Sequence, residues 1–326
     1  MQTVLVTGCA GFIGSHVTEA LLAKGLKVVG IDNFDPFYPR AVKEKNLSHS
    51  INHPHFSFFE TDCSDKDGLI RLPGNIDLVI HLAAKAGVRP SIEDPQGYIK
   101  ANIIGTQNIL QWMVSHGVKK LVFASSSSVY GNNPKLPFSE ADNVDNPISP
   151  YAFTKKANEL MNFTWHDLHG IDVVNLRFFT VYGPRQRPDL AIHKFASLIG
   201  QNQPITLFGD GSMGRDYTFI SDIVAGIMAA IGYVMANQKV YEIINLGNSS
   251  PVTLHELSYT LFRLMGKQQN ILYKPVQPGD VAFTYADTTK AAKLLGFRPN
   301  THLVEGLQRF LEWWEQSHSQ NGRHGL

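Results

Sequence analysis

The chain has only two cysteines, Cys9 and Cys63, among its 326 residues. Two thiols cannot build a disulfide framework, and residues 1–7 lack the basic and long apolar regions of a signal peptide. The longest uncharged apolar run covers residues 223–236, which is fourteen residues. A membrane-spanning helix needs about twenty. These absences predict a cytoplasmic protein that does not enter a membrane.

An excess of positive charge is also missing, because 29 Lys and Arg stand against 28 Asp and Glu. Proteins that hold nucleic acid by its phosphates usually carry a clear basic excess, so we expect no nucleic-acid partner. His49, His53 and His55 lie in a polar stretch without a cysteine or acid at ligand spacing, so we expect no metal site. The length suggests two domains, or one large domain with an added lobe.

Short apolar runs alternate with helix-length segments through the first half of the chain. Strands are expected at residues 3–7, 27–31, 56–60, 78–82, 120–124 and 173–177, and helices at 12–24, 102–116 and 151–169. Strands that are apolar throughout and alternate with helices indicate a parallel sheet that is covered on both faces. The predicted fold class is therefore α/β, a doubly wound parallel sheet of the Rossmann type.

The composition of the chain changes near residue 178, where Gly, Pro, Asp and Arg begin to cluster and the expected helices and strands become shorter. We predict a Rossmann domain over residues 1–178 and a smaller α/β lobe over residues 179–326. The lobe would mainly bind substrate, and its segments can interleave with the first domain.

Three glycines, Gly8, Gly11 and Gly14, stand directly between the first expected strand and helix. The first allows a tight turn, the second lets backbone N–H groups approach a pyrophosphate, and the third lets the helix pack on the strand. Asp32 follows Gly14 by eighteen positions, at the end of the second strand. A carboxylate there bonds the adenosine ribose and repels a 2′-phosphate, so the pattern favours NAD over NADP. Asp62 ends the third strand, where it would meet the adenine.

A second pattern begins the helix expected from residue 151. Ser149 is a candidate N-cap and Pro150 a candidate first helical residue, while Tyr151 and Lys155 are four apart and share a helix face. Ionising a tyrosine at pH 7 ordinarily costs about 4 kcal/mol, and a nearby ammonium and helix N-terminus reduce that cost. Tyr151 then becomes a general base for an alcohol. A serine run at 125–128 follows the fifth strand, where a donor to the reacting oxygen would be needed.

In these motifs the chain resembles the extended short-chain dehydrogenase/reductase family and, within it, the nucleotide-sugar epimerases. The resemblance rests on the glycine turn, Asp32, the segments 81–84, 125–131, 177–184, 214–217 and 278–280, Asn102, and the Tyr151/Lys155 pair. It implies an isomerase whose tightly held NAD oxidises C4 of a UDP-sugar and returns the hydride to the opposite face of the transient 4-keto intermediate. Ser126 would bond the 4-oxygen, Tyr151 would be the acid and base, and Lys155 would tune it and hold the ribose.

The resemblance also implies two sets of binding residues. Cofactor contacts are expected from Gly8, Gly11, Phe12, Ile13, Gly14, Asp32, Asn33, Asp62, Cys63, Leu82, Ala83, Ala84, Lys85, Asn102, Tyr151 and Lys155. Substrate contacts are expected from Arg89, Ser126, Ser127, Ser128, Tyr151, Thr180, Arg185, Arg187, Arg215 and Asp280.

Within the family, three features are similar to the UDP-glucuronate 4-epimerases: Thr180, the segment 185–191, and Gln277. Related dehydratases carry acids where this chain has Ser127 and Ser128, which disfavours dehydration. Hydroxyls at these serines and at Thr180 could hold a 6-carboxylate charged and turned away from the geometry that releases CO₂. We therefore expect conversion of UDP-glucuronate to UDP-galacturonate, for surface polysaccharide.

Two other functions stay open on the sequence: a UDP-glucose or UDP-N-acetylglucosamine 4-epimerase, and a non-catalytic NAD-binding sensor. Lys85 could contact an anion or point to solvent, and Arg89 could meet the substrate or form a structural ion pair. The resemblance further suggests a homodimer through the helices around residues 102–116 and 151–169.

Overall fold

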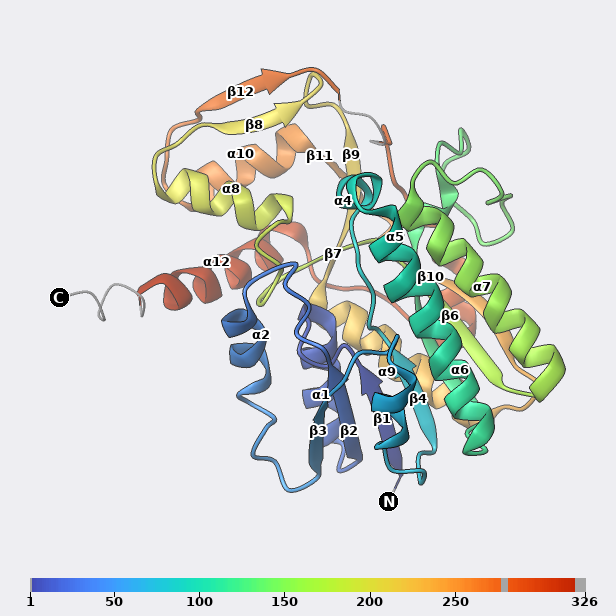
Figure 1. The fold of residues 1–326 in the computed structure, drawn as a ribbon. Coiled ribbons are helices and arrows are strands. Elements are labelled where there is room, and N and C mark those ends of the chain that lie inside the picture. Colours follow the sequence, from blue (N-terminus) through green and yellow to red (C-terminus); the bar gives the residue numbers. More distant parts are fainter. Residues whose placement is uncertain (1, 277–280, 320–326) are drawn as a thin grey trace.

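The structure, a computed structural model, describes residues 2–276 and 281–319. A seven-stranded sheet with helices on its faces forms the larger part, and a smaller lobe lies at the carboxyl ends of its strands (Figure 1). Its strands are β1 (Thr3–Thr7), β2 (Lys27–Asp32), β3 (Phe56–Glu60), β4 (Leu78–His81), β5 (Lys120–Ser126), β6 (Asp172–Phe178) and β10 (Tyr241–Leu246). The predicted α/β class is confirmed.

The strands run in the order β10-β6-β5-β4-β1-β2-β3, and every neighbouring pair is parallel. The order reverses at the β1/β4 pair, since the chain runs outward through β2 and β3 before it crosses back. In doubly wound sheets, ligands bind at this switch point, beyond the carboxyl ends of the strands. The topology therefore places the candidate site beside the glycine turn that follows β1.

Helices connect these strands and cover both faces of the sheet. They are α1 (Phe12–Ala23), α2 (Arg40–Leu47), α3 (Lys66–Ile70), α4 (Val88–Glu93), α5 (Pro95–Tyr98), α6 (Gly105–Ser115), α7 (Pro150–His169) and α9 (Ile220–Ala236). Capping at α7 follows the sequence signals: the Ser149 hydroxyl accepts the N–H of Ala152 at 3.1 Å, Pro150 is the first helical residue, and Gly170 ends the helix at φ +61°.

The helix expected from residue 102 begins differently. Residues Ile99–Ile104 form a π-helical turn, and α6 starts only at Gly105. The carbonyl of Asn102 accepts the Thr106 hydroxyl at 2.6 Å and the Asn158 amide at 2.8 Å, and its side chain bonds Lys85 and Thr154. These bonds to other elements favour the wider turn, and π-helical turns are frequent at functional sites.

The second lobe follows β6. It comprises β7 (Thr180–Tyr182), α8 (Ala191–Gly200), β8 (Ile205–Phe208), β9 (Gly214–Phe219), β11 (Pro251–Thr253), α10 (Leu254–Leu264), β12 (Ile271–Lys274), α11 (Thr289–Leu295) and α12 (Leu303–Ser319). Two later segments return to the first domain, because β10 pairs with β6 and α9 packs on the sheet. The division at residue 178 stays a prediction, with this interleaving inside it.

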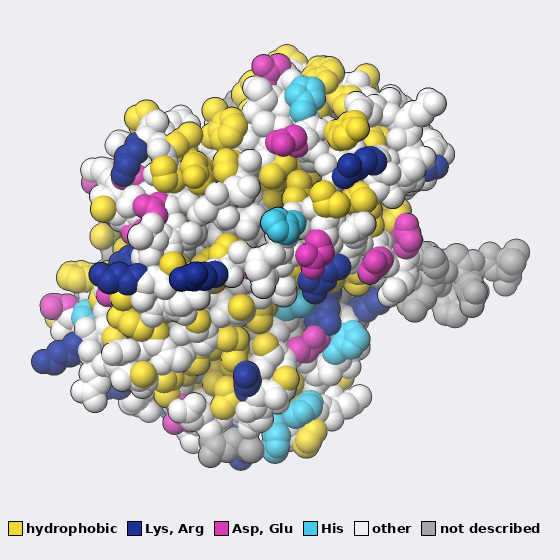
Figure 2. Space-filling view, turned by 180° about the vertical axis from the view of Figure 1, so that it is seen from behind, with side chains coloured by type: hydrophobic (Ala, Val, Ile, Leu, Met, Phe, Trp, Pro, Cys, Tyr) yellow, Lys and Arg dark blue, Asp and Glu magenta, His cyan; other side chains and the backbone are white. Residues whose placement is uncertain are grey.

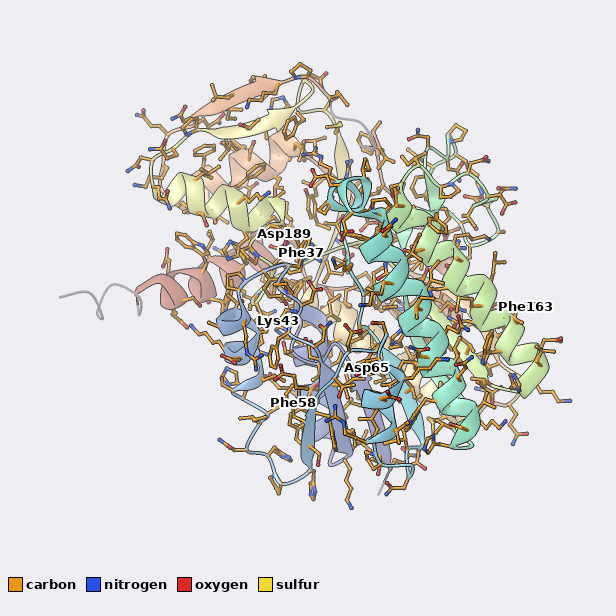
Figure 3. The ribbon with its side chains drawn as sticks, viewed as in Figure 1. Phe37, Lys43, Phe58, Asp65, Phe163 and Asp189 are labelled. Atoms are coloured by element: carbon orange, nitrogen blue, oxygen red, sulfur yellow. The ribbon has the colours of Figure 1, made fainter. Side chains whose placement is uncertain are left out.

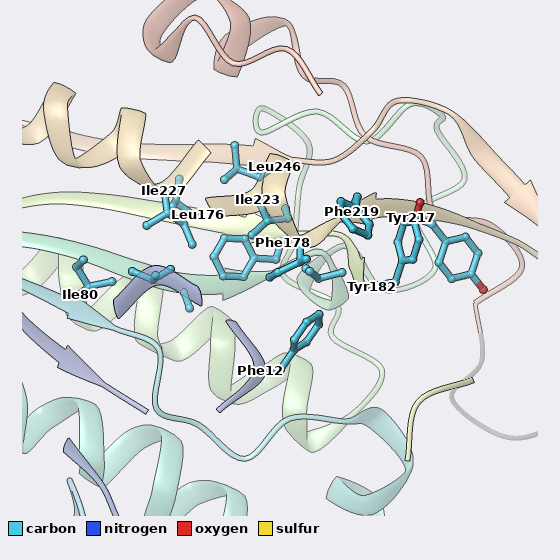
Figure 4. Packing of buried hydrophobic residues seen from close by; sticks show 14 of the residues in the cluster. Phe12, Ile80, Leu176, Phe178, Tyr182, Tyr217, Phe219, Ile223, Ile227 and Leu246 are labelled. Carbon is cyan, nitrogen blue, oxygen red and sulfur yellow. The ribbon is translucent and has the colours of Figure 1, made fainter. Parts of the chain in front are cut away.

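A continuous hydrophobic core joins the two parts. In Figure 4, Ile80 and Leu176 of the sheet lie in one cluster with Tyr182 and Phe219 of the second lobe. Because side chains of both parts pack in this one core, the second lobe is held against the strand ends of the sheet.

The outside of the molecule carries mixed charge. Lys and Arg side chains are scattered over the face in Figure 2, with Asp and Glu among them. Within the described residues, none of the helices is both long and apolar enough to cross a bilayer.

Candidate active site

One large cavity of about 540 Å³ lies at the switch point of the sheet. Its size is typical of a small-molecule or cofactor pocket. The predicted cofactor residues that line it are Gly8, Gly11, Phe12, Ile13, Gly14, Asp32, Asn33, Asp62, Cys63, Leu82, Ala83, Ala84, Lys85, Tyr151 and Lys155. The predicted substrate residues that line it are Ser126, Ser127, Ser128, Tyr151, Thr180, Arg187 and Arg215.

The glycine turn forms one wall, and side chains there would collide with backbone. A Cβ on Gly8, which has φ +70°, would lie 2.9 Å from the Cα of Ala83. A Cβ on Gly14 would lie 2.0 Å from the carbonyl oxygen of Gly8. Helix α1 begins at Phe12, so its free N–H groups face the cavity. This cradle fits a pyrophosphate held at a helix N-terminus.

Asp32 lies at the end of β2 and is buried. It accepts the N–H groups of Phe34 at 2.8 Å and Ala10 at 3.2 Å, and the Lys43 ammonium lies 3.7 Å away. Burial raises the pKa of the Asp32 carboxyl, and the charge of Lys43 opposes that rise. Farther along the same wall, the Asn33 amide donates to Asp62 at 2.9 Å. The arrangement fits the ribose and adenine of a dinucleotide.

Tyr151 and Lys155 face the cavity from the first turns of α7. The N–H of Tyr151 donates to the Ser91 hydroxyl at 3.0 Å, and the Lys155 ammonium donates to the carbonyl of Ala124 at 2.7 Å. Burial lowers the pKa of Lys155 to about 7, while the charge of Glu159 opposes the shift. Burial raises the pKa of Tyr151, against which a hydrogen bond with Ser126 and the charge of Arg187 act.

The serine run closes the end of β5 beside Tyr151. Ser126 ends the strand, and Ser127 begins a short 3₁₀ turn, η2 (Ser127–Tyr130). The Ser126 hydroxyl donates to that of Ser128 at 3.0 Å and accepts the N–H of Ser128 at 3.1 Å. Ser126 is thus hydrogen-bonded to Tyr151, and Ser127 and Ser128 line the same cavity.

Arg187 brings the second lobe to the cleft. It pairs with Asp189 at 2.6 Å, donates to the carbonyl of Ala86 at 3.1 Å, and lies 4.9 Å from the centre of the Phe37 ring. Figure 3 shows Phe37 and Asp189 close together where the loop after β2 meets the segment after β7. One guanidinium therefore joins three segments over the cavity.

Three of the predicted residues lie outside the cavity lining. Asn102 is buried behind it and holds the backbone of Lys85. Arg89 lies over the Phe208 ring at 4.5 Å. Arg185 bonds the Ser15 hydroxyl and pairs with Glu19 on α1. Asp280 and Gln277 fall outside the described residues.

Lys85 lines the cavity with its ammonium held by Asp94 at 2.9 Å. Sequence reasoning missed Phe37, Tyr38 and Lys43, which also line it. The two aromatics stand five and six residues after Asp32 in an aromatic-rich stretch, which is a usable signal. Lys43 is one of several charged residues on α2, and nothing in the sequence separates it from its solvated neighbours.

The histidine-rich stretch offers no ligand set. The rings of His53 and His55 lie 5.7 Å apart. Over the part of the chain that the structure describes, no cluster of three or more His, Cys, Asp or Glu side chains could hold a metal ion.

Comparisons with known proteins agree with this geometry. The chain is 43% identical to a UDP-glucuronate 4-epimerase of Thermodesulfobacterium geofontis, over 97% of each chain. The crystal structure of a UDP-glucuronic acid 4-epimerase from Bacillus cereus, in complex with UDP-glucuronic acid and NAD, superposes with a TM-score of 0.92 at 36% identity, covering 97% of this chain and 100% of that one. A UDP-glucose 4-epimerase from Thermotoga maritima with UDP-glucose gives a TM-score of 0.88 at 31% identity, covering 97% and 100%. The model of the NAD dependent epimerase/dehydratase family matches residues 4–247, and the chain belongs to that family.

Proposed function

We propose that this chain is an isomerase that interconverts UDP-glucuronate and UDP-galacturonate with NAD as its cofactor. The observation that carries the proposal is the convergence of Tyr151, Lys155 and Ser126 on the cavity beside the glycine turn, in a chain of this family. The substrate assignment is supported by the relatives from T. geofontis and B. cereus.

The cofactor would lie along the wall built by the glycine turn and Asp32. The turn leaves room for the pyrophosphate, and the Asp32 carboxylate would accept the hydroxyls of the adenosine ribose. Bound NAD supplies the acceptor, and later the donor, of the hydride at C4.

Tyr151 would take the proton of the 4-hydroxyl and return it after the sugar has turned. The buried phenol needs help to ionise, and the hydrogen bond with Ser126 and the charge of Arg187 both favour the phenolate. We expect the ammonium of Lys155, four residues along the same face of α7, to act in the same direction. With substrate bound, Ser126 would turn its one proton from Ser128 to the 4-oxygen while charge develops there. Because one residue removes and restores the proton, no second acid is needed.

The sugar carboxylate would be held by Ser127, Ser128 and Thr180, which line the same cavity. A 4-keto uronate is a β-keto acid, and it loses CO₂ when the carboxylate bond stands perpendicular to the ketone plane. Hydroxyl donors that keep the carboxylate charged and in another orientation protect the intermediate. The same residues provide no carboxylate for elimination, which disfavours a dehydratase.

Arg215 and Arg187 line the cavity on the second-lobe side and would meet the UDP phosphates. Arg89 is engaged with Phe208 and Arg185 with Glu19, so their predicted contacts with substrate require both side chains to turn. The UDP-glucose or UDP-N-acetylglucosamine alternative is less favoured, because these sugars have no 6-carboxylate for the three hydroxyls to hold.

The test is to incubate the purified protein with UDP-glucuronate and to follow its 4-epimer by proton NMR. UDP-glucose and UDP-N-acetylglucosamine are run in parallel. Turnover of UDP-glucuronate at a kcat/KM at least tenfold above the other two is expected. Preference for either neutral sugar would refute the uronate assignment while leaving the epimerase chemistry in place.

We also propose a homodimer through α6 and α7, which lie side by side in Figure 1. Ile104, Phe153 and Leu160 are large apolar side chains exposed on or beside these helices. A second copy of the chain would cover them. Light scattering of the protein and of a Leu160→Glu variant tests this, with a dimer expected for the first and a monomer for the second.

A cytoplasmic site of action and a role in supplying uronate for polysaccharide remain parts of this proposal. The cytoplasmic site is supported by the two buried cysteines, Cys9 and Cys63, which are free thiols.

A further inference from the structure

Helix α7 presents three polar side chains to β5 at intervals of four residues: Tyr151, Lys155 and Glu159. Such spacing puts them on one face of the helix. Lys155 donates to the carbonyl of Ala124 at 2.7 Å, and Glu159 accepts the Ser125 hydroxyl at 2.6 Å. The next residue of the strand, Ser126, pairs with Tyr151. Glu159 thus continues the row of catalytic side chains one turn deeper into the protein.

Glu159 is almost fully buried and is held at both oxygens. Arg177 on β6 donates to it from Nε at 2.9 Å and from Nη2 at 2.8 Å, and Arg177 is itself buried. Burial alone would lower the pKa of Arg177, but its bonds to Glu159 raise it. A bidentate pair with a third donor supplies hydrogen bonds to both carboxylate oxygens in a place where an isolated charge would be costly.

We infer that Glu159 is a positioning residue for the reaction: its carboxylate, fixed by Arg177 and Ser125, keeps the Lys155 ammonium charged and in place beside Tyr151. The inference rests on the proposed function only in using Tyr151 as the proton-transfer group.

The groups around Lys155 support this role. Tyr151 and Glu159 come from its own helix, and His81 faces it from β4. Burial, with the charge of Lys155, lowers the pKa of His81 to about 3, so His81 is neutral at working pH. Arg177, on β6, donates to both oxygens of Glu159. Among the described residues, Glu159 is the charge that favours the ammonium, whose pKa of about 7 leaves little margin.

The test is Glu159→Gln, which keeps the shape of the side chain and removes its charge. Without that charge the pKa of Lys155 falls further, so the alkaline limb of the kcat profile moves to lower pH by about 1 unit or more. Loss of packing alone would reduce kcat at every pH and leave the limb in place. An unmoved limb would overturn the inference.

Glu159→Gln leaves Arg177 buried without its partner, which can prevent folding. The double variant Glu159→Gln/Arg177→Met removes both charges, and its alkaline limb should still move to lower pH, by less than in the single variant. The matched control is Asp222→Asn on α9, another buried carboxylate changed to its amide, which accepts the N–H of Thr301. The alkaline limb of the kcat profile of Asp222→Asn should lie at the same pH as in the wild type. A shift in this control as large as that in Glu159→Gln would overturn the inference.

A second readout needs no substrate. The near-ultraviolet absorbance of tyrosinate, taken as the difference between each protein and its Tyr151→Phe counterpart, reports the ionisation of Tyr151 directly. If the ammonium is lost early in Glu159→Gln, the pH dependence of this signal changes relative to wild type. This result stands even if UDP-glucuronate proves not to be the substrate, so failure of the two proposals can be told apart.

Discussion

Substitution of Gly8 provides the sharpest test of the proposal that the glycine turn binds the dinucleotide. In Gly8→Ala the residue must keep φ +70°, which costs about 1–2 kcal/mol for an L side chain. Its new Cβ would also lie 2.9 Å from the Cα and N of Ala83, so the loop after β4 has to move. That movement breaks the bonds from the N–H groups of Leu82 and Ala83 to the Thr7 hydroxyl, at 3.1 and 3.0 Å. At about 1 kcal/mol each, the total loss is roughly 3–4 kcal/mol.

Gly25→Ala is the matched control, because Gly25 has φ +75° and its added Cβ meets no described atom within 4 Å. It should lose only the 1–2 kcal/mol of backbone strain and keep its NAD. Chemical unfolding gives the two free energies, and NAD released from the denatured proteins gives cofactor content. Gly8→Ala should purify with little NAD and little activity. If Gly8→Ala retained as much NAD as Gly25→Ala, the proposal that the glycine turn binds the pyrophosphate would be refuted.

Three further predictions follow from the same site. Tyr151→Phe should lower kcat by about 10²–10⁴-fold with NAD content unchanged, since the hydroxyl transfers the proton and does not grip the dinucleotide. Ser127→Ala combined with Ser128→Ala should release more CO₂ per turnover from UDP-glucuronate than wild type; equal release would refute their role in protecting the intermediate. His81 has a pKa of about 3 in the folded protein and an ordinary value near 6.5 when unfolded. Between these values the unfolded chain binds the extra proton, so the free energy of unfolding falls as pH falls, by up to about 1.4 kcal/mol per pH unit. In His81→Gln this part of the pH dependence should disappear, as unfolding curves at several pH values would show.

Local signals in the sequence were enough for much of the fold and for helix α7. Ser149, Pro150 and the four-residue spacing of Tyr151 and Lys155 are encoded within one short segment, and the structure has all of them as predicted. The same holds for the glycine turn, because the strand, the turn and the helix are adjacent in the chain.

What sequence reasoning missed depends on contacts between distant segments. Arg185 was expected at the substrate, yet it pairs with Glu19, which is far away in the sequence. Lys43 lies beside Asp32 because α2 folds back over the end of β2. Periodicity indicates which face of a helix is buried, but it does not identify the charge that the face will meet.

The hydrogen bonds around His81 explain how the glycine turn and helix α7 keep a fixed relation. The Thr7 hydroxyl accepts two backbone N–H groups, so its one proton goes to Nδ1 of His81 at 2.7 Å. His81 must then carry its proton on Nε2 and donate it to Thr106 at 3.1 Å, whose hydroxyl donates to the carbonyl of Asn102. That carbonyl also accepts the amide of Asn158 on α7. A second proton on His81 would face the Thr7 hydroxyl with another donor, so acid should loosen the glycine turn.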